Sequence, residues 1–456
     1  ASDVSVRKAL GVTGGTLLFT GVVWLAGTGP EPPERPLPKG YVERLASPDP
    51  RERAEAEEEL RALGPSAVNA LPPDAIAGIA DPAAREAVEA VRDRLLLRNL
   101  EAEPDGRRVT LAWDGPLSGA VQSLNGTPAE ESHFPHAVPH ANATDATDEA
   151  SPRVEVRAVH EPYWSVVDEI ARQAGMVPTI GRGQARSGIR FRERTPADEA
   201  RRVVHHRAFR IAAGPVEPET DPERGRPACR VPLTVMAEPS VRLLSVSYAG
   251  GDLRLVAGDG TELPPLDPEA RHVPPAEPQV PVVELRPAFL TPAEPVAGPL
   301  SIRGTLTAAV AVGPRSFMFP LRAGEAREHA EDGVSVRLGD VTPNPDGISE
   351  VELTVTYGTA ARKYDPRPDW ATAGTAYIRH LVEGNPEYRP EPGVTTEAVD
   401  GGAVVRYRFR NLPGDLTYQV LHYETWALFV ETPVEFAIDG LTAADGALSA
   451  GSGGGR

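Results

Sequence analysis

The spacing of hydrophobic residues changes along the chain. In the first hundred residues apolar positions recur every three or four residues, as in Ala84, Val88, Val91 and Leu95, which would share one face of a helix. Beyond about residue 185, apolar and polar residues alternate in short runs, which is typical of strands with one buried face. The pattern predicts a β-rich α+β protein in which a small helical part precedes antiparallel sheets.

Residues 41–100 are expected to form the helical unit. One helix is predicted from Glu52 to Leu63 and a second from Asp81 to Asn99, with Asp81 as the N-cap. The pair, interrupted by a Leu-Gly-Pro break, resembles a HEAT repeat. Solenoids of such repeats usually need three or more copies, so we expect this unit to pack against a neighbour.

A strand, a turn and a helix follow one another twice in residues 107–183. Residues 109–124 form the first copy, which a polar insert, residues 125–151, interrupts. The second copy reads VEVRAVHEPYWSVVDEIARQAGM. It resembles the short βαβ module found at the start of secretins and TonB-dependent receptors.

A wider resemblance follows from three features together: the HEAT-like pair, the βαβ-like modules and the later segment PVEFAIDGL. With them, the chain resembles a group of envelope proteins common in planctomycetes. The resemblance implies an extracytoplasmic scaffold or protein-binding role. It implies no reaction and supplies no catalytic or binding residue.

The N-terminus carries the pattern of a membrane segment. Residues 9–27 contain no charged side chain and follow Arg7 and Lys8, the order of a secretory signal or an uncleaved anchor. As a helix they would span about 28 Å, close to the hydrocarbon core of a bilayer. A buried core helix is the alternative. The five prolines of residues 29–40 predict an extended spacer, and the chain beyond the segment would lie outside the cytoplasmic membrane.

Residues 185–441 are expected to form two antiparallel sandwiches. The predicted strands include Leu300–Val312, Phe317–Leu321, Tyr418–Tyr423 and Trp426–Ile438, and a short helix is predicted at Tyr377–Val382. The expected division of the chain is a signal-like or transmembrane segment, 1–28; a Pro-rich spacer, 29–40; the HEAT-like unit, 41–100; the interrupted βα or βαβ module, 107–183; two sandwich-like domains, 185–325 and 326–441; and a flexible tail, 442–456.

Charge argues against nucleic acid as a partner. The 456 residues contain 47 Lys and Arg against 65 Asp and Glu, a net charge of −18, whereas nucleic-acid binding needs clustered cations. One basic cluster stands out, and we interpret it as a solvated face of a strand or helix. It consists of Arg201, Arg202, His205, His206 and Arg207.

The side chains suited to catalysis or metal binding are few. Cys229 is the only cysteine, which excludes an internal disulfide and a Cys-x-x-Cys zinc site; we expect it to be a buried thiol. The weak candidates for a metal site are His133, His136 and His140, in the insert. Prolines interrupt any helix there, so we favour an exposed linker and expect no cofactor. The adjacent His205 and His206 would point to opposite faces of a strand.

No Gly-x-Ser-x-Gly elbow or phosphate-binding loop occurs in the chain. We therefore expect a membrane-tethered, extracytoplasmic scaffold or protein-binding module without catalytic activity. Its partners would be proteins of the cell envelope and, through residues 9–27, the lipid bilayer. Two alternatives stay open: an extracytoplasmic hydrolase, assisted by a metal in one version, and a structural subunit of a surface filament or large envelope complex.

Metal analysis of the purified protein distinguishes the scaffold hypothesis from the metal-assisted hydrolase. The scaffold hypothesis predicts no stoichiometric zinc, and no change in metal content on His136→Ala substitution. Stoichiometric zinc that is lost in the His136→Ala variant would favour the hydrolase instead.

Overall fold

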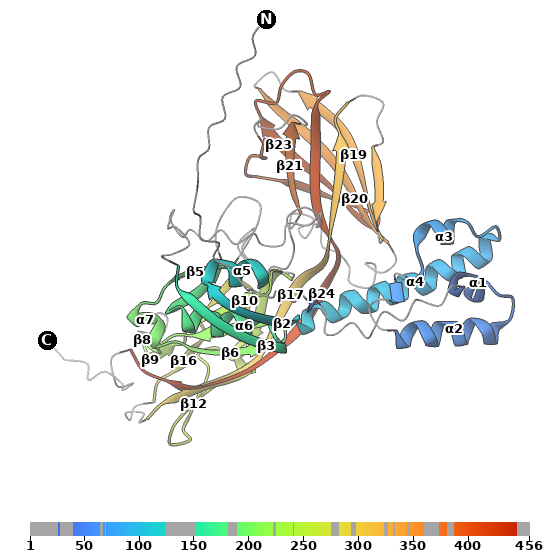
Figure 1. The fold of residues 1–456 in the computed structure, drawn as a ribbon. Coiled ribbons are helices and arrows are strands. Elements are labelled where there is room, and N and C mark those ends of the chain that lie inside the picture. Colours follow the sequence, from blue (N-terminus) through green and yellow to red (C-terminus); the bar gives the residue numbers. More distant parts are fainter. Residues whose placement is uncertain are drawn as a thin grey trace, which may run out of the picture.

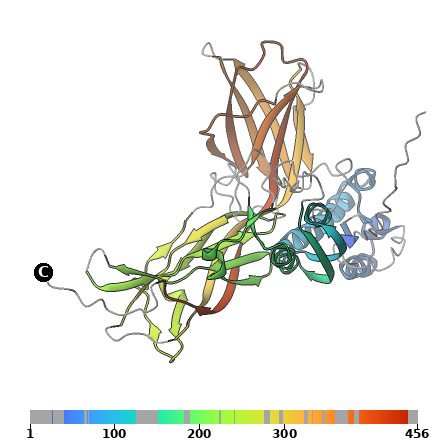
Figure 2. The same cartoon turned by 60° about the vertical axis from the view of Figure 1, so that its left-hand side comes forward.

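The computed structural model shows a β-rich α+β protein, in agreement with the sequence (Figure 1). A helical unit projects from one side of two β-sandwiches, and a smaller βα unit packs against one of the sandwiches (Figures 1 and 2). The structure describes residues 26–27, 40–63, 67–68, 70–124, 151–180, 189–221, 225–239, 241–274, 282–292, 298–322, 327–331, 333–343, 347–358, 374–380 and 387–444.

Two long strands run through both sandwiches. β17 (Leu300–Pro320) and β24 (Gln419–Leu441) have 21 and 23 residues. They pair antiparallel from Leu300 opposite Leu441 to Pro320 opposite Val420. We call this pair the ribbon. Each of its strands corresponds to two separate strands in the sequence prediction, so that division was wrong.

The sandwich drawn lower in Figure 1 is called the lower sandwich. It packs one sheet against the part of the ribbon that contains the start of β17 and the end of β24. Beside β17 in the ribbon's sheet lie β11 (Arg242–Ala249) and β12 (Leu253–Ala257), with short strands at their margins. The facing sheet has the order β15-β10-β7-β6. The bounds of these and the accompanying strands are β6 Arg202–His206, β7 Phe209–Ala213, β8 Glu217–Thr220, β9 Pro227–Arg230, β10 Leu233–Ala237, β13 Glu262–Leu263, β14 Arg271–His272, β15 Val282–Leu285 and β16 Ala288–Leu290.

The other sandwich, called the upper sandwich, packs a five-stranded sheet against the part of the ribbon that contains the end of β17 and the start of β24. In the ribbon's sheet β24 also pairs with β21 (Thr375–His380). This strand occupies the start of the segment Tyr377–Val382, where the sequence predicted a helix; Tyr377 and Ile378 are buried in the sheet, so strand pairing overrode the local preference. The five-stranded sheet consists of β18 Glu328–Glu331, β19 Val334–Pro343, β20 Ile348–Tyr357, β23 Gly402–Arg410 and β22 Thr395–Val399.

The alternation predicted from the sequence produces one continuous core. Val351, Leu353 and Val355 are fully buried on β20, and their polar neighbours face outward. Across the sandwich, the rings of Tyr357 and Phe429 meet edge to face at 5.5 Å. Buried residues of both sandwiches belong to a single hydrophobic cluster. The expected units 185–325 and 326–441 therefore share the ribbon and its core.

The helical unit has a separate core. Apolar side chains of its helices, among them Leu60, Val88 and Leu95, bury one another. Asp49 accepts a hydrogen bond from the Arg51 N–H at 2.9 Å and so caps the second helix. The long helices are close to those predicted. The bounds are α1 Tyr41–Leu45, α2 Pro50–Ala62, α3 Pro73–Ala77 and α4 Pro82–Ala102, followed by a 3-10 turn, Glu103–Asp105.

The βα unit repeats the predicted order of strand and helix. It contains β2 (Arg108–Pro116), α5 (Leu117–Leu124), β3 (Arg153–Pro162), α6 (Tyr163–Gln173), β4 (Met176–Ile180) and β5 (Ile189–Glu193). β2 pairs antiparallel with β3, and β4 pairs antiparallel with β5. Within the described residues the two strands that flank α6 are not paired with each other, which differs from a parallel βαβ unit.

Several predicted features lie outside the described residues. They are residues 1–25 of the signal-like or transmembrane segment, nearly all of the spacer, the histidine-containing insert and the end of the tail. Ala26 and Gly27, the last residues of the apolar run, form β1, which pairs with β2. None of the helices in the described ranges is long and apolar enough to cross a bilayer.

The helical unit meets the ribbon at a glycine. Leu100 of α4 is buried in the core of the sandwiches. Gly313 has a φ of +65°, and a Cβ atom there would lie 2.3 Å from Leu100 Cδ2 and 3.1 Å from Ala427 Cβ. Only glycine avoids both the left-handed strain and the collision. Gly313 therefore lets the end of α4 rest on the ribbon where the two sandwiches meet.

Replacing Gly313 with alanine tests this contact. We expect Gly313→Ala to lower the free energy of unfolding by about 3 kcal/mol, because left-handed strain and overpacking add. The control is Gly333→Ala, since Gly333 has a φ of +82° but nothing within 4 Å of the added Cβ; it should lose only about 1 kcal/mol. Urea denaturation followed by circular dichroism measures both, and equal losses would contradict the packing argument.

Candidate functional site

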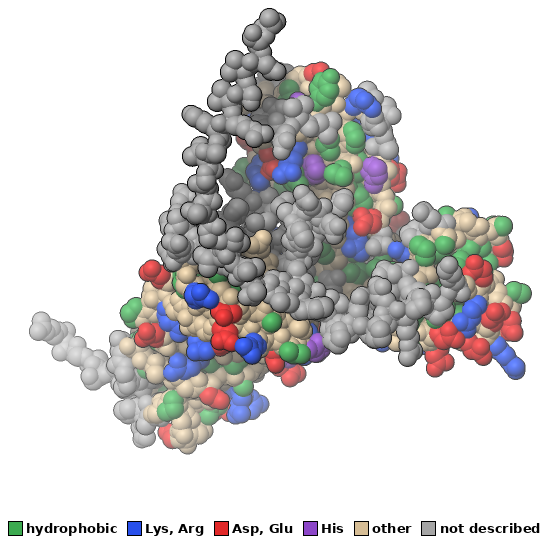
Figure 3. All heavy atoms as spheres, in the orientation of Figure 1, with side chains coloured by type: hydrophobic (Ala, Val, Ile, Leu, Met, Phe, Trp, Pro, Cys, Tyr) green, Lys and Arg blue, Asp and Glu red, His purple; other side chains and the backbone are tan. Residues whose placement is uncertain are grey.

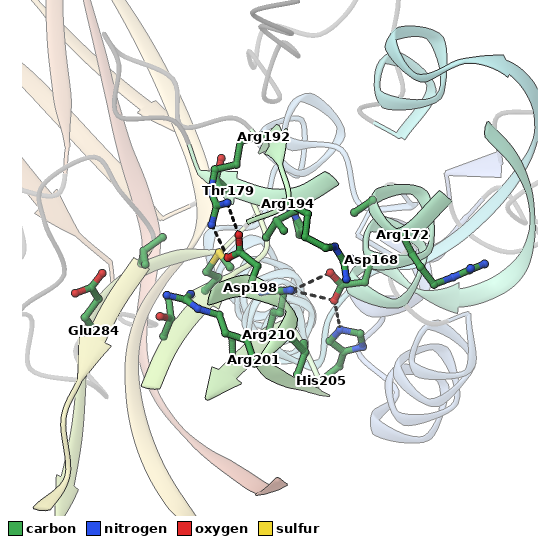
Figure 4. Close-up of a pocket in the computed structure, with 18 of the residues that line it drawn as sticks. Asp168, Arg172, Thr179, Arg192, Arg194, Asp198, Arg201, His205, Arg210 and Glu284 are labelled. Carbon is green, nitrogen blue, oxygen red and sulfur yellow. Dashed lines mark hydrogen bonds and ion pairs between the residues drawn. The ribbon is translucent and has the colours of Figure 1, made fainter. Parts of the chain in front are cut away.

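A cavity of about 800 Å³ lies beside the lower sandwich, where the βα unit meets it. Its walls come from α6, from the β4–β5 hairpin, from the short helix α7 (Pro196–Glu199) and from the sheet β15-β10-β7-β6 (Figure 4). Charged side chains converge on it, and apolar residues such as Val203, Met236 and Val282 complete the lining. This cavity is the candidate functional site.

The joint between α6 and the sandwich fixes one wall of the cavity. Trp164 is buried and donates its indole N–H to the Ala208 carbonyl at 3.0 Å. The backbone N–H of Arg107 donates to both oxygens of the Glu238 carboxylate, at 3.0 and 3.2 Å, and Glu238 is fully buried. The Arg107 guanidinium lies 4.7 Å from the centre of the Tyr163 ring. These contacts hold the start of α6, and therefore Asp168 one turn later, against the sheet.

Asp168 is the acceptor at the base of the cavity. Its carboxylate lies 2.7 Å from Nε2 of His205 and accepts from Nε of Arg210 at 2.9 and 3.1 Å (Figure 4). Burial acts to raise the pKa of Asp168, but the hydrogen bonds from His205 and Arg210 outweigh it, and the pKa lies below its usual value. Asp168 is therefore ionised at neutral pH and holds both partners in place.

Asp198 holds a second arginine of the cavity, Arg192, in place. Its carboxylate forms a two-pronged ion pair with Arg192, at 2.5 and 2.6 Å, and also accepts from the backbone N–H and hydroxyl of Thr195. These bonds, that from Arg192 above all, hold the pKa of Asp198 well below its usual range although burial opposes them. The Thr195 contacts cap α7, so the helix start and the ion pair stabilise each other.

Three arginines keep donor groups free. Arg210 is only 5% exposed, and its Nε alone is paired; within the described residues its terminal nitrogens make no hydrogen bond. Arg201 has no side-chain partner in the described ranges, and Arg194 reaches only the Met176 carbonyl, at 3.5 Å. The lining contains five arginines and three acidic residues, a surplus of two positive charges with His205 neutral.

The site also contains a serine, a histidine and an aspartate in contact in series, as in serine hydrolases. Ser165 Oγ lies 3.3 Å from His205 Nδ1, and His205 Nε2 contacts Asp168. Ser165 is not part of the cavity lining, and Asp168 is shared with Arg210. The serine hydroxyl is therefore not among the groups that a substrate in the cavity would meet.

The predicted basic cluster is divided by strand geometry. Arg201 and His205 line the cavity, whereas His206 lines a shallow hollow on the other face with Asp252 and Glu435. This confirms that the adjacent histidines point in opposite directions. Arg207, with a φ of 54°, turns toward Asp105 instead.

The other predicted chemical residues are placed as follows. Cys229 is fully buried, as expected, and burial raises the pKa of its thiol to about 11. His133, His136 and His140 lie outside the described residues. Among the described residues, no three His, Cys, Asp or Glu side chains lie close enough together to hold a metal ion.

Sequence reasoning missed most of the arginines of the cavity. Arg192 and Arg194 alternate with Glu193 at the end of β5, and such a repeat of like charges on one face of a short strand was a usable sign. The pairing of Arg210 with Asp168 could not be recognised in the sequence, since the two residues lie 42 positions apart and come together only in the fold.

Comparison with known proteins gives no match, whether with family models, characterised proteins or solved structures. The resemblance to envelope proteins therefore stays a prediction, and the site is interpreted from its own geometry.

Removing the Asp168 carboxylate tests its role at the base of the cavity. Its pKa is depressed in the folded state, so its contribution to stability is present above the unfolded pKa, about 3.9, and is lost as pH falls through the folded value. We expect Asp168→Asn to lower the free energy of unfolding by about 2 kcal/mol at pH 7, and the difference from the native protein to shrink below about pH 4. Urea titrations at several pH values measure this.

Glu169→Gln is the matched control, because Glu169 is the next residue on α6 and pairs with the exposed Arg172. It should change stability little at any pH, as exposed ion pairs contribute little. A pH-independent loss in Asp168→Asn would contradict the assigned ionisation.

Proposed function

We propose that the protein is a membrane-tethered, extracytoplasmic scaffold that binds other molecules and has no catalytic activity. The apolar residues 9–27 behind Arg7 and Lys8, and the proline-rich spacer after them, support the tether. Together they would hold the folded part away from a bilayer surface.

The ribbon is the observation that carries the scaffold role. One pair of strands passes through both sandwiches, and the end of α4 packs on its midpoint. A shared core makes the sandwiches one body, whereas separately folded domains joined by a linker move independently. Surfaces far apart in the sequence are thus held at fixed positions, which suits simultaneous contact with several partners.

Exposed surfaces of different character are available for partners. Acidic side chains gather on the helical unit (Figure 3), and α2 exposes Glu52, Glu55 and Glu58. The candidate cavity instead has a positive surplus. The two surfaces would therefore select partners of opposite charge.

The filament alternative receives less support from the sheet edges. β18 is an edge strand in the described part of its sheet, and all four of its residues are exposed. Glu328 and Glu331 at its ends place charge on that edge, a feature that opposes edge-to-edge pairing of sheets.

The metal-assisted version of the hydrolase alternative was based on His133, His136 and His140, which lie outside the described residues. Among the described residues, the alternative would rest on the series Ser165–His205–Asp168. Its hydroxyl lies outside the cavity lining, and its acid is engaged by Arg210. We therefore interpret the series as structural support for the cavity wall.

The location of the protein tests the tether. Produced as a full chain in a Gram-negative host, it should remain in membranes washed with alkaline carbonate, and protease added to spheroplasts should degrade it. Leu17→Arg places a charge within the apolar run, at a cost of about 3 kcal/mol for insertion, and should reduce the membrane-bound share. Equal recovery of both forms in the cytoplasm would exclude the proposed location.

A serine-directed fluorophosphonate tests whether Ser165 is a catalytic nucleophile. We expect no labelling of the folded protein, because a productive serine needs both an aligned base and space for substrate. Labelling that disappears in Ser165→Ala and in His205→Ala would establish the hydrolase alternative instead. The urea-unfolded protein serves as the measure of background reaction.

A further inference from the structure

We propose that the cavity binds a phosphate group, held by Arg194, Arg201 and Arg210. The inference rests on the proposed binding role and names the ligand chemistry at that site. The three side chains approach from different elements: Arg194 follows β5, Arg201 precedes β6, and Arg210 stands in β7 (Figure 4).

The first argument is the state of Arg210. The Arg210 residue is nine-tenths buried, but its terminal nitrogens are not among the buried atoms that lack a partner, so they are open to solvent in the cavity. Asp168 occupies only Nε, while the terminal nitrogens make no hydrogen bond within the described residues. Because Arg210 lines the cavity, an anion in it would supply acceptors for these nitrogens.

The second argument is the fixed charge of the lining. Each acidic group that is paired in the cavity is committed: Asp168 to His205 and Arg210, and Asp198 to Arg192. Both carboxylates are ionised at neutral pH. Apart from Arg172, which is paired with Glu169 outside the lining, four arginines face three acidic residues, a surplus of one positive charge that an anion would neutralise. In a chain of net charge −18 such a surplus is local, and a recess concentrates its field.

The third argument distinguishes phosphate from carboxylate. One guanidinium fork satisfies a planar carboxylate, as Arg192 does for Asp198. Arg194 and Arg201 are exposed residues that line the same cavity as Arg210, and a tetrahedral group with several oxygens offers acceptors to more than one guanidinium. The apolar wall of Val203, Met236 and Val282 leaves space for the organic part of a phosphate monoester. Such a group can belong to a small soluble molecule or to a lipid headgroup.

Calorimetric titration of the full chain in detergent, in a phosphate-free buffer, tests the proposal. The probes are inorganic phosphate, glycerol 3-phosphate and the short-chain lipid dihexanoyl phosphatidic acid. We expect all three to bind, and binding to weaken with added salt and below pH 6, where phosphate becomes a monoanion. Arg194→Gln and Arg201→Gln should each raise Kd about tenfold, a loss of about 1.4 kcal/mol.

Arg172→Gln is the matched control. Arg172 lies at the margin of the same cavity, but it is paired with Glu169 and points away from the other arginines (Figure 4). Its substitution should leave Kd unchanged. Urea unfolding of each variant verifies that the fold is retained.

The outcomes separate the sources of the phosphate group. Equal affinity for glycerol 3-phosphate and the short-chain lipid indicates a soluble ligand, and affinity at least tenfold higher for the lipid indicates a headgroup. Absence of heat with all three probes, or equal weakening in Arg172→Gln and Arg201→Gln, would overturn the proposal. Neither result affects the membrane location or the fluorophosphonate test, so failure of the phosphate site is distinguishable from failure of the scaffold role.

Discussion

The backbone ladder between β17 and β24 is the interaction on which the rest of the molecule depends. Because the ladder continues over about 20 residues of each strand, both sandwiches are built on one surface and share one core. The alternation of side chains then fixes which residues face which opposing sheet, since a shift of one residue would turn every apolar side chain outward. The joint at Gly313 takes its position from this register, and β24 contacts β6 and β7, which form part of the cavity wall.

The sequence revealed individual elements more readily than their continuity. Hydrophobic spacing correctly predicted the two long helices and alternating strands such as β20, because each buries one face, but it predicted a helix where β21 forms. It divided both ribbon strands in two, and in β17 the reason is that Gly313 and Pro314 have the character of a turn. In the structure Pro314 pairs with Trp426 in the part of β17 that lies at the sheet edge, where its missing N–H is tolerated. A ladder formed with a distant strand outweighed the local preference.

The candidate cavity shows a second limit of the sequence. Its charged groups come from α6, β5, α7, β6 and β7, which are adjacent only after the strands have paired. The visible cluster from Arg201 to Arg207 overstated the local charge, since alternate residues of β6 face opposite sides. The ion pair of Arg210 with Asp168 joins a buried strand to a helix 42 residues away and leaves no local pattern. Side-chain chemistry was thus readable at each position, but its convergence required the fold.

The attachment of α4 at Gly313 has a mechanical consequence. A pull on the helical unit is carried in part by the backbone that continues from α4 into β2, and in part by the packing of Leu100 near the middle of the ribbon, away from the strand ends. Tension directed along the strands would act on many β17–β24 backbone hydrogen bonds at the same time. These bonds would have to break together and not one after another. The two sandwiches would hold the ribbon on either side of that point. Under tension on the tether, the helical unit would then unfold before the sandwiches.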